Sequence, residues 1–475
     1  MRAQAFTVGR IGLTLAGLLA VIAGAIASDR PARLAADAPG SAPIAAPTFT
    51  RDVAPILFRY CATCHRPGEV APMSLLSFEE VRPWAKAIKA KVVAREMPPW
   101  FADPAASMKL RNERRLSETD IDTVAAWVDA GAPRGEDAHL PTPPVFPAGW
   151  QNGTPDYVIE MPVDVELPAE GEIEIQDFFV PVPFPTDRFA QVLEFRPGTP
   201  GVLHHGGAYM VDLPAGTRLV NGRALGPDGR QLRRDEIRGR GESVFETQGA
   251  SKLISFHPGQ GIERHPPGVA KRIAAGKFVH FNMHYQPTGR PEHDRTKLGI
   301  WFAKDRVTHE VLTQTVSQHF IIEGREAPLD VIMVNGEPKY TELIPLIPPF
   351  VGNWRMAAVR TFRTPATLYG LSPHMHLRGK DAKYVVAFPD GRIETVLTIP
   401  RYDFNWQLHD ELETPLKIPA GSVMLGVAHF DNSVGNRYNP GPEKRVFWSD
   451  QSWDEMLLLH IEISVDDQIL PSAQP

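Results

Sequence analysis

The chain of 475 residues is longer than one hydrophobic core usually supports, so its length predicts several domains. Its formal net charge of -6 mixes both signs, which excludes the strongly basic composition that is typical of nucleic-acid binding. The 46 prolines and 38 glycines favour many short strands and turns over a purely helical protein.

The N-terminus has the features of an export signal. Two arginines flank the start of the apolar run IGLTLAGLLAVIAGAIA at 11–27, which ends in the small-residue pattern of a cleavage site. We predict a signal peptide over 1–27 and hence a periplasmic or secreted bacterial protein. An uncleaved run would instead anchor the chain to a membrane. The Ala- and Pro-rich residues 28–47 predict a flexible linker.

Residues 48–135 predict a small all-α domain. The runs RDVAPILFRYC and SFEEVRPWAKAIKAKVVARE place apolar residues three and four apart. LSETDIDTVAAWVDAGAP predicts a helix with Ser117 as its N-cap, Asp120 three residues on, and an end near Gly131. The Pro-rich residues 136–156 predict a second linker.

From 157 to 470 the chain changes to short β-branched and aromatic runs separated by Pro, Gly and Asn. This region exceeds a common single sandwich, so we predict two all-β sandwich domains, at 157–325 and 326–470. The runs that predict strands are YVIEMPVDVELP, IEIQDFFVPVPF, FAQVLEFRPG, KFVHFNMHYQP, KLGIWFA, ATLYGLSPHMHLRG, KYVVAFPDGR, GSVMLGVAHFDN and MLLLHIEISV.

Both cysteines of the chain lie in CATCH, residues 61–65. In a C-x-x-C-H motif, Cys61 and Cys64 form thioethers to a haem and His65 ligates its iron. A dithiol redox pair and a partial zinc site are alternatives. The first lacks a thioredoxin-like setting, and the second lacks another pair of ligands. We therefore predict one covalently bound haem c.

A pure electron carrier needs a second axial ligand on the haem. Met97, in REMPPW, is the preferred candidate because the prolines after it fix an extended loop. Met73, in VAPMSL, is the weaker candidate, and a Met packed in the core is the remaining interpretation. The order of helix, CxxCH, Met loop and C-terminal helix over 48–135 resembles a small class I cytochrome c. That resemblance implies Met97.

Histidines gather at three places in the predicted β region. The clusters are His204 and His205 in GVLHHGGAY, His280 and His284 in HFNMHYQP, and His374 and His376 in SPHMHLRGK. The last pair is two residues apart, which places both side chains on one face of a strand. Histidine clusters without cysteine suit copper or zinc, and spacing alone leaves the metal undecided.

Five separated motifs of this region occur in the order found in one enzyme family. They are VLEFRPGTPGVLHHGGAYMVD, FHPGQGIERHPPGVAKRIAAGKFVHFNMHYQ, SPHMHLRGKDAKYVV, IPAGSVMLGVAHFDNS and SWDEMLLL. Over about 157–467 the chain thus resembles the copper type II ascorbate-dependent monooxygenases, the family of peptidylglycine alpha-hydroxylating monooxygenase and dopamine beta-monooxygenase. The resemblance implies two jelly-roll-like sandwiches, two copper ions and hydroxylation of a C–H bond of a small substrate with O₂.

The resemblance also implies the ligands of each copper. Those of the oxygen-activating copper are His374, His376 and Met456, the last in WDEML. Those of the electron-supplying copper are His204, His205 and His284. Without the resemblance, Met456 would be interpreted as a core residue of the last strand. The histidines that match no family ligand, and that we interpret as structural, are His257, His265, His280, His429 and His460.

The chemistry of these ligand types fits the two implied roles. A thioether favours Cu(I) and leaves the copper open to O₂, and three imidazoles make a firmer site that cycles between Cu(I) and Cu(II). The peptide-amidating members hold a peptide carboxylate with three side chains, which this chain replaces by Ser372, Leu458 and His460. Peptide amidation is therefore not expected, and the substrate stays unassigned.

The sequence thus predicts a periplasmic haem- and copper-containing monooxygenase. We expect the cytochrome-like domain to relay electrons singly to the copper of His204, His205 and His284, from a cytochrome, a quinol-linked chain or an ascorbate-like reductant. One alternative is a non-catalytic electron-transfer or copper-binding protein that kept the ligands. Another is a different cytochrome-fed oxidoreductase, which no Gly-rich dinucleotide fingerprint supports.

Overall fold

The computed structural model divides the chain into two compact units, Met1–Ala46 and Pro47–Pro475. It describes residues 46–147, 149–232, 236–237, 250–316, 319–322, 325–327, 331–334, 337–340, 347–447, 449, 451–468 and 470. The predicted signal peptide 1–27 lies outside the described residues, as does the predicted linker 28–47 apart from its last two residues. Within the described part of the chain, no helix is long and apolar enough to cross a membrane.

Short helices with a core of their own form the first part of the second unit, which we call the helical segment (residues 48–135). Its elements are η1 (Phe49–Val53), α2 (Ala54–Tyr60), α3 (Phe78–Val81), η2 (Arg82–Trp84), α4 (Ala85–Val93) and α5 (Glu118–Asp129), followed by η3 (Asp137–His139). Ser117 and Asp120 form the predicted capping box at the start of α5. Phe49 and Trp127 pack in the core of the segment.

Two sheets follow, antiparallel except for the parallel pair β10 and β14, and pack face to face around a second core. The strands are β1 (Tyr157–Glu160), β2 (Val165–Leu167), β3 (Gln176–Pro181), β4 (Arg188–Arg196), β5 (Leu203–Val211), β6 (Arg218–Val220), β7 (Arg223–Leu225), β8 (Ala250–Phe256), β9 (Ile262–Arg264), β10 (Val269–Ile273), β11 (Phe278–Tyr285), β12 (Glu292–Asp294), β13 (Lys297–Phe302) and β14 (His309–Glu310), with η4 (Pro200–Val202) before β5. One sheet has the order β1-β13-β4-β10-β14, with β9 beside β4, and the other β3-β11-β5-β8. Leu193 and Ile300 of the first sheet meet Ala208 and Phe281 of the second.

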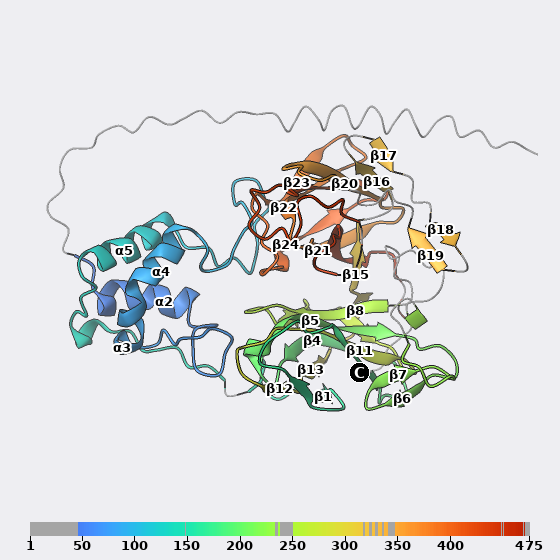
Figure 1. Ribbon diagram of the computed structural model, residues 1–475, viewed down its shortest axis with the longest axis horizontal. Helices are drawn as coiled ribbons and strands as arrows, with labels where there is room; N and C mark the ends of the chain where they lie inside the picture. The colour runs from blue at the N-terminus through green and yellow to red at the C-terminus, as the bar shows by residue number, and fades with distance from the viewer. Residues whose placement is uncertain are drawn as a thin grey trace, which may run out of the picture. The chain divides into compact units, whose positions relative to one another are not determined.

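The rest of the chain repeats this β-sandwich architecture. The strands are β15 (Leu312–Thr315), β16 (His319–Ile322), β17 (Arg325–Ala327), β18 (Val331–Val334), β19 (Glu337–Tyr340), β20 (Trp354–Thr361), β21 (Ala366–His374), β22 (Gly379–Ala387), β23 (Ile393–Ile399), β24 (Asp410–Ile418), β25 (Val423–Phe430) and β26 (Leu458–Val465). The sheets have the orders β15-β26-β21-β24 and β17-β16-β20-β25-β22-β23. Their facing residues, such as Leu371, Leu459, Tyr384 and Met424, form the largest core. Figure 1 colours the first sandwich mainly green and the second mainly orange to red.

The predicted strands agree with the structure. The first sandwich ends, and the second begins, earlier in the chain than the predicted join at 325/326. β14 still pairs with β10 of the first sandwich, whereas β15 already pairs with β26 of the second. Only Val311 separates β14 from β15. The chain passes between the sandwiches without the Gly- or Pro-rich linker that would mark a boundary in the sequence.

The loop between α4 and α5, which we call the connecting segment (residues 94–116), contacts the second sandwich. The backbone N–H of Asp103 donates to the carbonyl of Thr398 at 2.8 Å, and that of Arg111 donates to the carbonyl of Glu411 at 2.8 Å. Trp100 packs in the core of the second sandwich and is 7% exposed. The helical segment is therefore joined to the second sandwich by backbone pairing and by apolar burial.

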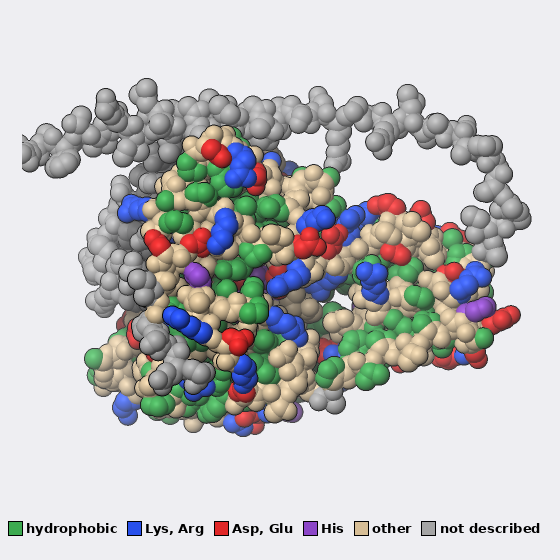
Figure 2. Space-filling model, turned by 180° about the vertical axis from the view of Figure 1, so that it is seen from behind, with side chains coloured by type: hydrophobic (Ala, Val, Ile, Leu, Met, Phe, Trp, Pro, Cys, Tyr) green, Lys and Arg blue, Asp and Glu red, His purple; other side chains and the backbone are tan. Residues whose placement is uncertain are grey.

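Charges of both signs lie side by side on the surface. On the face drawn in Figure 2, Lys and Arg side chains alternate with Asp and Glu side chains. This distribution agrees with the mixed composition and the net charge of -6.

Candidate metal and haem centres

Two neighbouring strands of the first sandwich bring together His204, His205 and His284, which we now call the first cluster. β5 and β11 pair antiparallel with His205 directly opposite His284, which brings their ring centroids to 4.1 Å. His204, one residue earlier, has its Nδ1 atom 2.8 Å from Nδ1 of His205. The side-chain carbonyl of Asn282 lies 3.0 Å from Nε2 of His284. Strand pairing thus brings His284 to the adjacent pair His204 and His205, which lies about 80 residues earlier in the chain.

His374 and His376, which we now call the second cluster, lie at the end of a strand rather than along it. β21 ends at His374, so His376 belongs to the turn that follows. The prediction that both histidines lie on one face of the same strand is therefore wrong for His376. The two rings still lie 5.2 Å apart, nearly perpendicular to each other, while Met375 between them is fully buried in the core. Burial of Met375 holds the turn so that both imidazoles project to the same side.

Neighbouring polar groups orient the rings of this pair. Nδ1 of His374 lies 2.5 Å from the side-chain carbonyl of Gln407, and Nδ1 of His376 lies 3.3 Å from the backbone carbonyl of Asp454. Such contacts fix the tautomer and orientation of an imidazole and are typical of histidines that bind metals.

Glu455 holds the turn of the second cluster against the predicted Met456. Its buried carboxylate accepts the backbone N–H of His376 at 2.8 Å, of Arg378 at 2.6 Å and of Met456 at 3.2 Å. Burial raises the pKa of Glu455 to about 8. One side chain therefore fixes two chain segments, more than 75 residues apart, that carry the histidine pair and the thioether.

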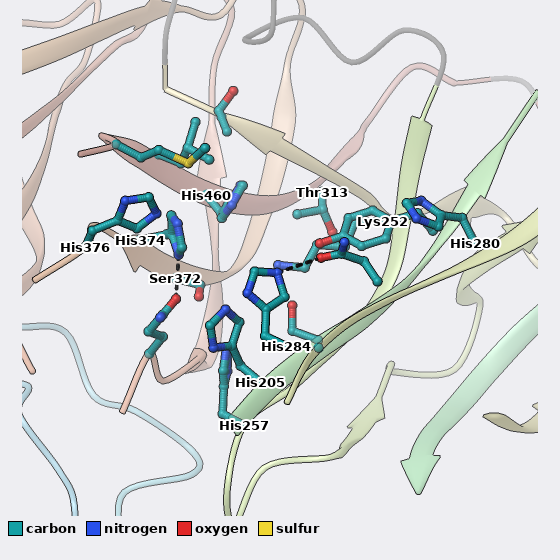
Figure 3. Close-up of a pocket in the computed structure, with 18 of the residues that line it drawn as sticks. His205, Lys252, His257, His280, His284, Thr313, Ser372, His374, His376 and His460 are labelled. Atoms are coloured by element: carbon teal, nitrogen blue, oxygen red, sulfur yellow. Dashed lines mark hydrogen bonds between the residues drawn. The ribbon is translucent and has the colours of Figure 1, made fainter. Parts of the chain in front are cut away.

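Both clusters line a single cavity of about 190 Å³ between the sandwiches. Figure 3 shows His374 and His376 on one side of it, facing His205 and His284 on the other. The predicted residues in its wall are His205, His284, His374, His376 and Met456. Strands far apart in the sequence thus meet at one hollow.

Phe404 stands between the two clusters. Its ring centroid lies 5.4 Å from that of His204, 6.0 Å from that of His205 and 6.0 Å from that of His376. An aromatic side chain at this position packs against histidines of both clusters.

Burial favours the neutral form of His205 and His376 in the cavity wall. Burial lowers the pKa of His376 to about 3 and that of His205 well below its usual value. Neutral imidazole is the form that coordinates a metal ion. Imidazoles with one thioether form a donor set suited to copper, so these residues fit the predicted ions. Among the described residues, no three His, Cys, Asp or Glu side chains already converge in a geometry that could hold a metal ion.

Other histidines and one lysine complete the cavity wall. His280 is hydrogen-bonded to the carboxylate of Asp177 at 2.8 Å and stacks on Phe179, which agrees with a structural role even though it also borders the cavity. His429, by contrast, pairs with Asp381 at 2.6 Å outside the cavity. The residues of the wall that sequence reasoning left without a functional role include Lys252, His257, Phe404, Gln407 and His460.

The wall also contains the three residues that the resemblance matched to the carboxylate-binding groups of the amidating enzymes. Ser372, Leu458 and His460 all line the cavity. Lys252 borders it as well, and burial lowers the pKa of its ammonium group to about 8. The cavity thus combines apolar surface with one cationic group on β8.

A second cavity, of about 670 Å³, is lined by the CATCH motif. Cys61, Cys64 and His65 form part of its wall together with Met97, the preferred methionine. Nδ1 of His65 lies 3.2 Å from the backbone carbonyl of Met73, a contact that fixes the imidazole through its other nitrogen. Met73 itself packs against the core of the helical segment.

The thiols of the motif are not arranged as a reactive dithiol. Burial raises the pKa of Cys61 to about 12 and also raises that of Cys64. Dithiol redox motifs need a lowered thiol pKa, because the thiolate is the nucleophile. These thiol environments therefore disfavour the redox-pair alternative.

Arg114 provides a test of whether a haem fits this cavity. Its guanidinium lines the cavity, and its Nε and Nη2 atoms are buried without a hydrogen-bond partner among the described residues. A buried guanidinium with two nitrogen atoms unpaired is costly, and a carboxylate would pair with them. The propionate of a haem bound to Cys61 and Cys64 is such a group, so the residues present fit a haem.

The residues missed by sequence reasoning gave weak signals. Glu455 directly precedes the predicted Met456 in WDEML, so the acidic neighbour of a ligand was the available sign. Gln407 and Phe404 lie in no quoted motif, and only their place in the tertiary structure reveals them. His257 lies in the motif that begins FHPGQG, but it matches no family ligand and was interpreted as structural.

Comparisons with known proteins leave the family open. No family model matches the chain, and no curated protein matches it. Among solved structures, a protein of the infectious bursal disease virus Gx strain is 11% identical over 70% of this chain and 78% of that one, with a TM-score of 0.17. A Paenibacillus xanthan lyase is 9% identical over 70% of this chain and 27% of that one, with a TM-score of 0.16. A Bacillus subtilis oxalate decarboxylase is 9% identical over 70% of this chain and 82% of that one, with a TM-score of 0.14.

Proposed function

We propose that the protein is a periplasmic, haem- and copper-containing monooxygenase that hydroxylates a C–H bond of a small substrate with O₂. The observation that carries the proposal is the common cavity. Five of the six residues implied as copper ligands line it, and the sixth, His204, contacts one of those five. Residues with unrelated roles would not be expected to line the same cavity.

Each set of side chains has a stated part in the proposal. His204, His205 and His284 would hold one copper, and His374, His376 and Met456 the other. Bound copper ions would supply one-electron redox chemistry and the activation of O₂. Phe404 packs against histidines of both sets, and Gln407 and Glu455 hold the second set in position.

The proposed reaction needs electrons from outside the cavity. Inserting one atom of O₂ into a C–H bond releases the other atom as water and consumes two electrons and two protons. The helical segment is proposed to be a class I cytochrome c-like domain that relays those electrons, and the sandwiches to be jelly-roll-like. The haem would be held by Cys61, Cys64 and His65, with Met97 as its second axial ligand. Support comes from the position of all four in one cavity with Arg114.

The cavity walls bear on the substrate. Ser372, Leu458 and His460 replace the groups with which peptide-amidating enzymes hold a carboxylate, and they border the hollow. Leu458 and the neighbouring Met456 give this part of the wall an apolar surface. The proposal is therefore a small, largely apolar substrate rather than a peptide carboxylate.

The decisive experiment is metal and haem analysis of the full-length protein from a periplasmic extract. We expect two copper ions and one haem per chain. His374→Ala and Met456→Ala should each lower copper to about one per chain, because each removes a ligand of the same site. His429→Ala, which removes a histidine paired with Asp381 outside the cavity, is the matched control and should keep both ions.

A second measurement separates an enzyme from a copper carrier. With ¹⁸O₂ and a panel of small aliphatic and aromatic substrates, one labelled oxygen atom should appear in a product. Haem without copper after copper loading would overturn the proposal. Two coppers without any oxygen incorporation would instead favour the non-catalytic electron-transfer or copper-binding alternative.

A further inference from the structure

Two neighbouring residues of the first sandwich line both cavities. His257 lines the histidine cavity and also the cavity of the CATCH motif, and Ser255, two residues before it at the end of β8, does the same. His257 is 8% exposed, and its ring centroid lies 6.2 Å from that of His205. Figure 3 shows it directly below His205. The wall between the two cavities is therefore one residue thick at this point.

A tight turn holds His257 in this wall. The backbone N–H and carbonyl of His257 pair with those of Gln260 at 2.8 Å in both directions. The side chain of Gln260 in turn accepts the backbone N–H of His409 at 2.8 Å and donates to its carbonyl at 3.0 Å. The turn belongs to the first sandwich and His409 to the second, so both sandwiches fix the position of the imidazole.

The same turn touches the CATCH motif. Gly259 has a φ of +77°, and a Cβ atom built on it would lie 2.8 Å from Sγ of Cys64 and 3.0 Å from Nη1 of Arg114. Nη1 of Arg114 donates to the carbonyl of Gly259 at 3.4 Å. A short stretch of chain thus runs in contact from the sulfur that would carry the haem to the ring beside a predicted copper ligand.

We propose that His257 is a positioning residue that couples the two cavities for electron transfer. This role rests on the proposed function. With both groups bound, one electron at a time would leave a ferrous haem and reach a cupric ion beside His205 by way of the turn 257–260. The haem would be oxidised and the copper reduced, and no proton or atom would be transferred. Electron transfer slows steeply across empty space, so a route of bonded and contacting atoms sets its rate.

The test follows a single electron in the full-length protein loaded with haem and copper. Under anaerobic conditions, a photoexcited small-molecule donor reduces the haem, and the decay of the ferrous haem absorbance is recorded together with the loss of the cupric electron paramagnetic resonance signal. In the wild-type protein the two changes should coincide. His257→Phe, which keeps a ring but loses both nitrogens, should slow them by at least about tenfold, the effect expected when an outer contact of a metal ligand is lost.

Matched variants separate the route from general damage. His265→Phe alters a buried histidine of the same sandwich that lines neither cavity, and it should keep the wild-type rate. Gly259→Ala leaves His257 in place but forces the turn away from Cys64, and it should slow the transfer as His257→Phe does. If His257→Phe fails to fold, His257→Gln is measured in the same way.

The outcomes are distinct for the two proposals. A rate in His257→Phe within about twofold of wild type, with copper and haem content unchanged, overturns the coupling role and leaves the proposed function intact. Loss of one copper in His257→Phe also overturns it, because His257 would then be a ligand. A wild-type protein that binds no copper overturns both.

Discussion

At the scale of single residues, Glu455 illustrates how the site is held together. Its carboxylate accepts three backbone N–H groups, from His376, Arg378 and Met456. These donors belong to segments that also carry the predicted ligands. The side chain therefore links the geometry of the site to the stability of the fold.

Glu455→Ala should lower the free energy of unfolding by at least about 2 kcal/mol, because buried N–H groups would lose their acceptor. It should also weaken copper binding at the proposed site of His374, His376 and Met456 by about tenfold. Chemical denaturation and copper titration measure the two effects. Glu413→Ala, at an exposed position of the same sandwich, should change neither. An unchanged copper affinity in Glu455→Ala would contradict the role of Glu455 in holding the segments of His376 and Met456 together.

Arg114 supports a second prediction at this scale. Removing a buried cation beside the proposed haem would favour the ferric, more positive state, so Arg114→Gln should lower the reduction potential of that haem. The expected shift is on the order of 60 mV, which corresponds to about 1.4 kcal/mol for one electron. A spectroelectrochemical titration measures it. Arg115→Gln, at the exposed neighbouring position, is the control, and equal shifts in both variants would count against a propionate partner for Arg114.

At the scale of elements, the connecting segment decides how the helical segment is attached. Its residues pair with Thr398 of β23 and with Glu411 of β24, and Trp100 fills part of the core of the second sandwich. Deleting the whole of 48–135 would therefore remove core atoms of the sandwich as well as the haem motif. Point variants of the cysteines are the cleaner way to remove a haem.

Trp100→Ala should destabilise the protein by about 3–5 kcal/mol, since it leaves a large cavity in a packed core. It should also make the connecting segment more susceptible to proteolysis than in the wild type. Thermal unfolding and limited trypsin digestion measure these effects. Trp84→Ala alters a tryptophan of the helical segment that is 45% exposed and should stay within about 0.5 kcal/mol of wild type. Equal effects of the two variants would contradict the anchoring role of Trp100.

At the scale of the whole molecule, a buried ion cluster joins the two sandwiches. Lys271 of β10 pairs with Glu263 at 2.8 Å and with Glu462 of β26 at 2.7 Å. His409 lies 3.3 Å from the same Glu462. Although burial opposes its charge, the neighbouring carboxylates raise the pKa of His409 to about 9. The charges offset one another across the interface between the sandwiches, and breaking one pair would leave another group buried and unpaired.

This cluster predicts a pH dependence of stability. A histidine whose pKa is raised in the folded protein stabilises it below the unfolded value near 6.5, and that contribution is lost as the pH rises to about 9. The free energy of unfolding should therefore fall by roughly 3 kcal/mol between pH 6 and pH 9 through this group. Urea denaturation at both pH values measures the change.

His409→Gln removes the titrating group, so its stability should vary less with pH over this range. His139→Gln, at an exposed position of the helical segment, should keep the wild-type slope. A wild-type slope in His409→Gln would show that another group is responsible.

The sequence by itself determined the local features whose signals are short-range. Alternating apolar runs located the strands, and the Ser117 and Asp120 spacing located the start of α5, because both depend on neighbours within a few residues. Motifs and a resemblance also named the candidate ligands. The prediction that His374 and His376 lie on one strand face was less accurate. The strand ends at His374, where Met375 is buried and Glu455 accepts the backbone N–H of His376.

The tertiary structure alone decided what those residues share. It brought His205 opposite His284, placed both near His374 and Met456 around one cavity, and set His257 in the wall of a second cavity. It also passed the connecting segment into the core of the second sandwich. These relations depend on strand pairing and packing between residues tens to hundreds of positions apart, and a local pattern in one sequence carries no information about such distances.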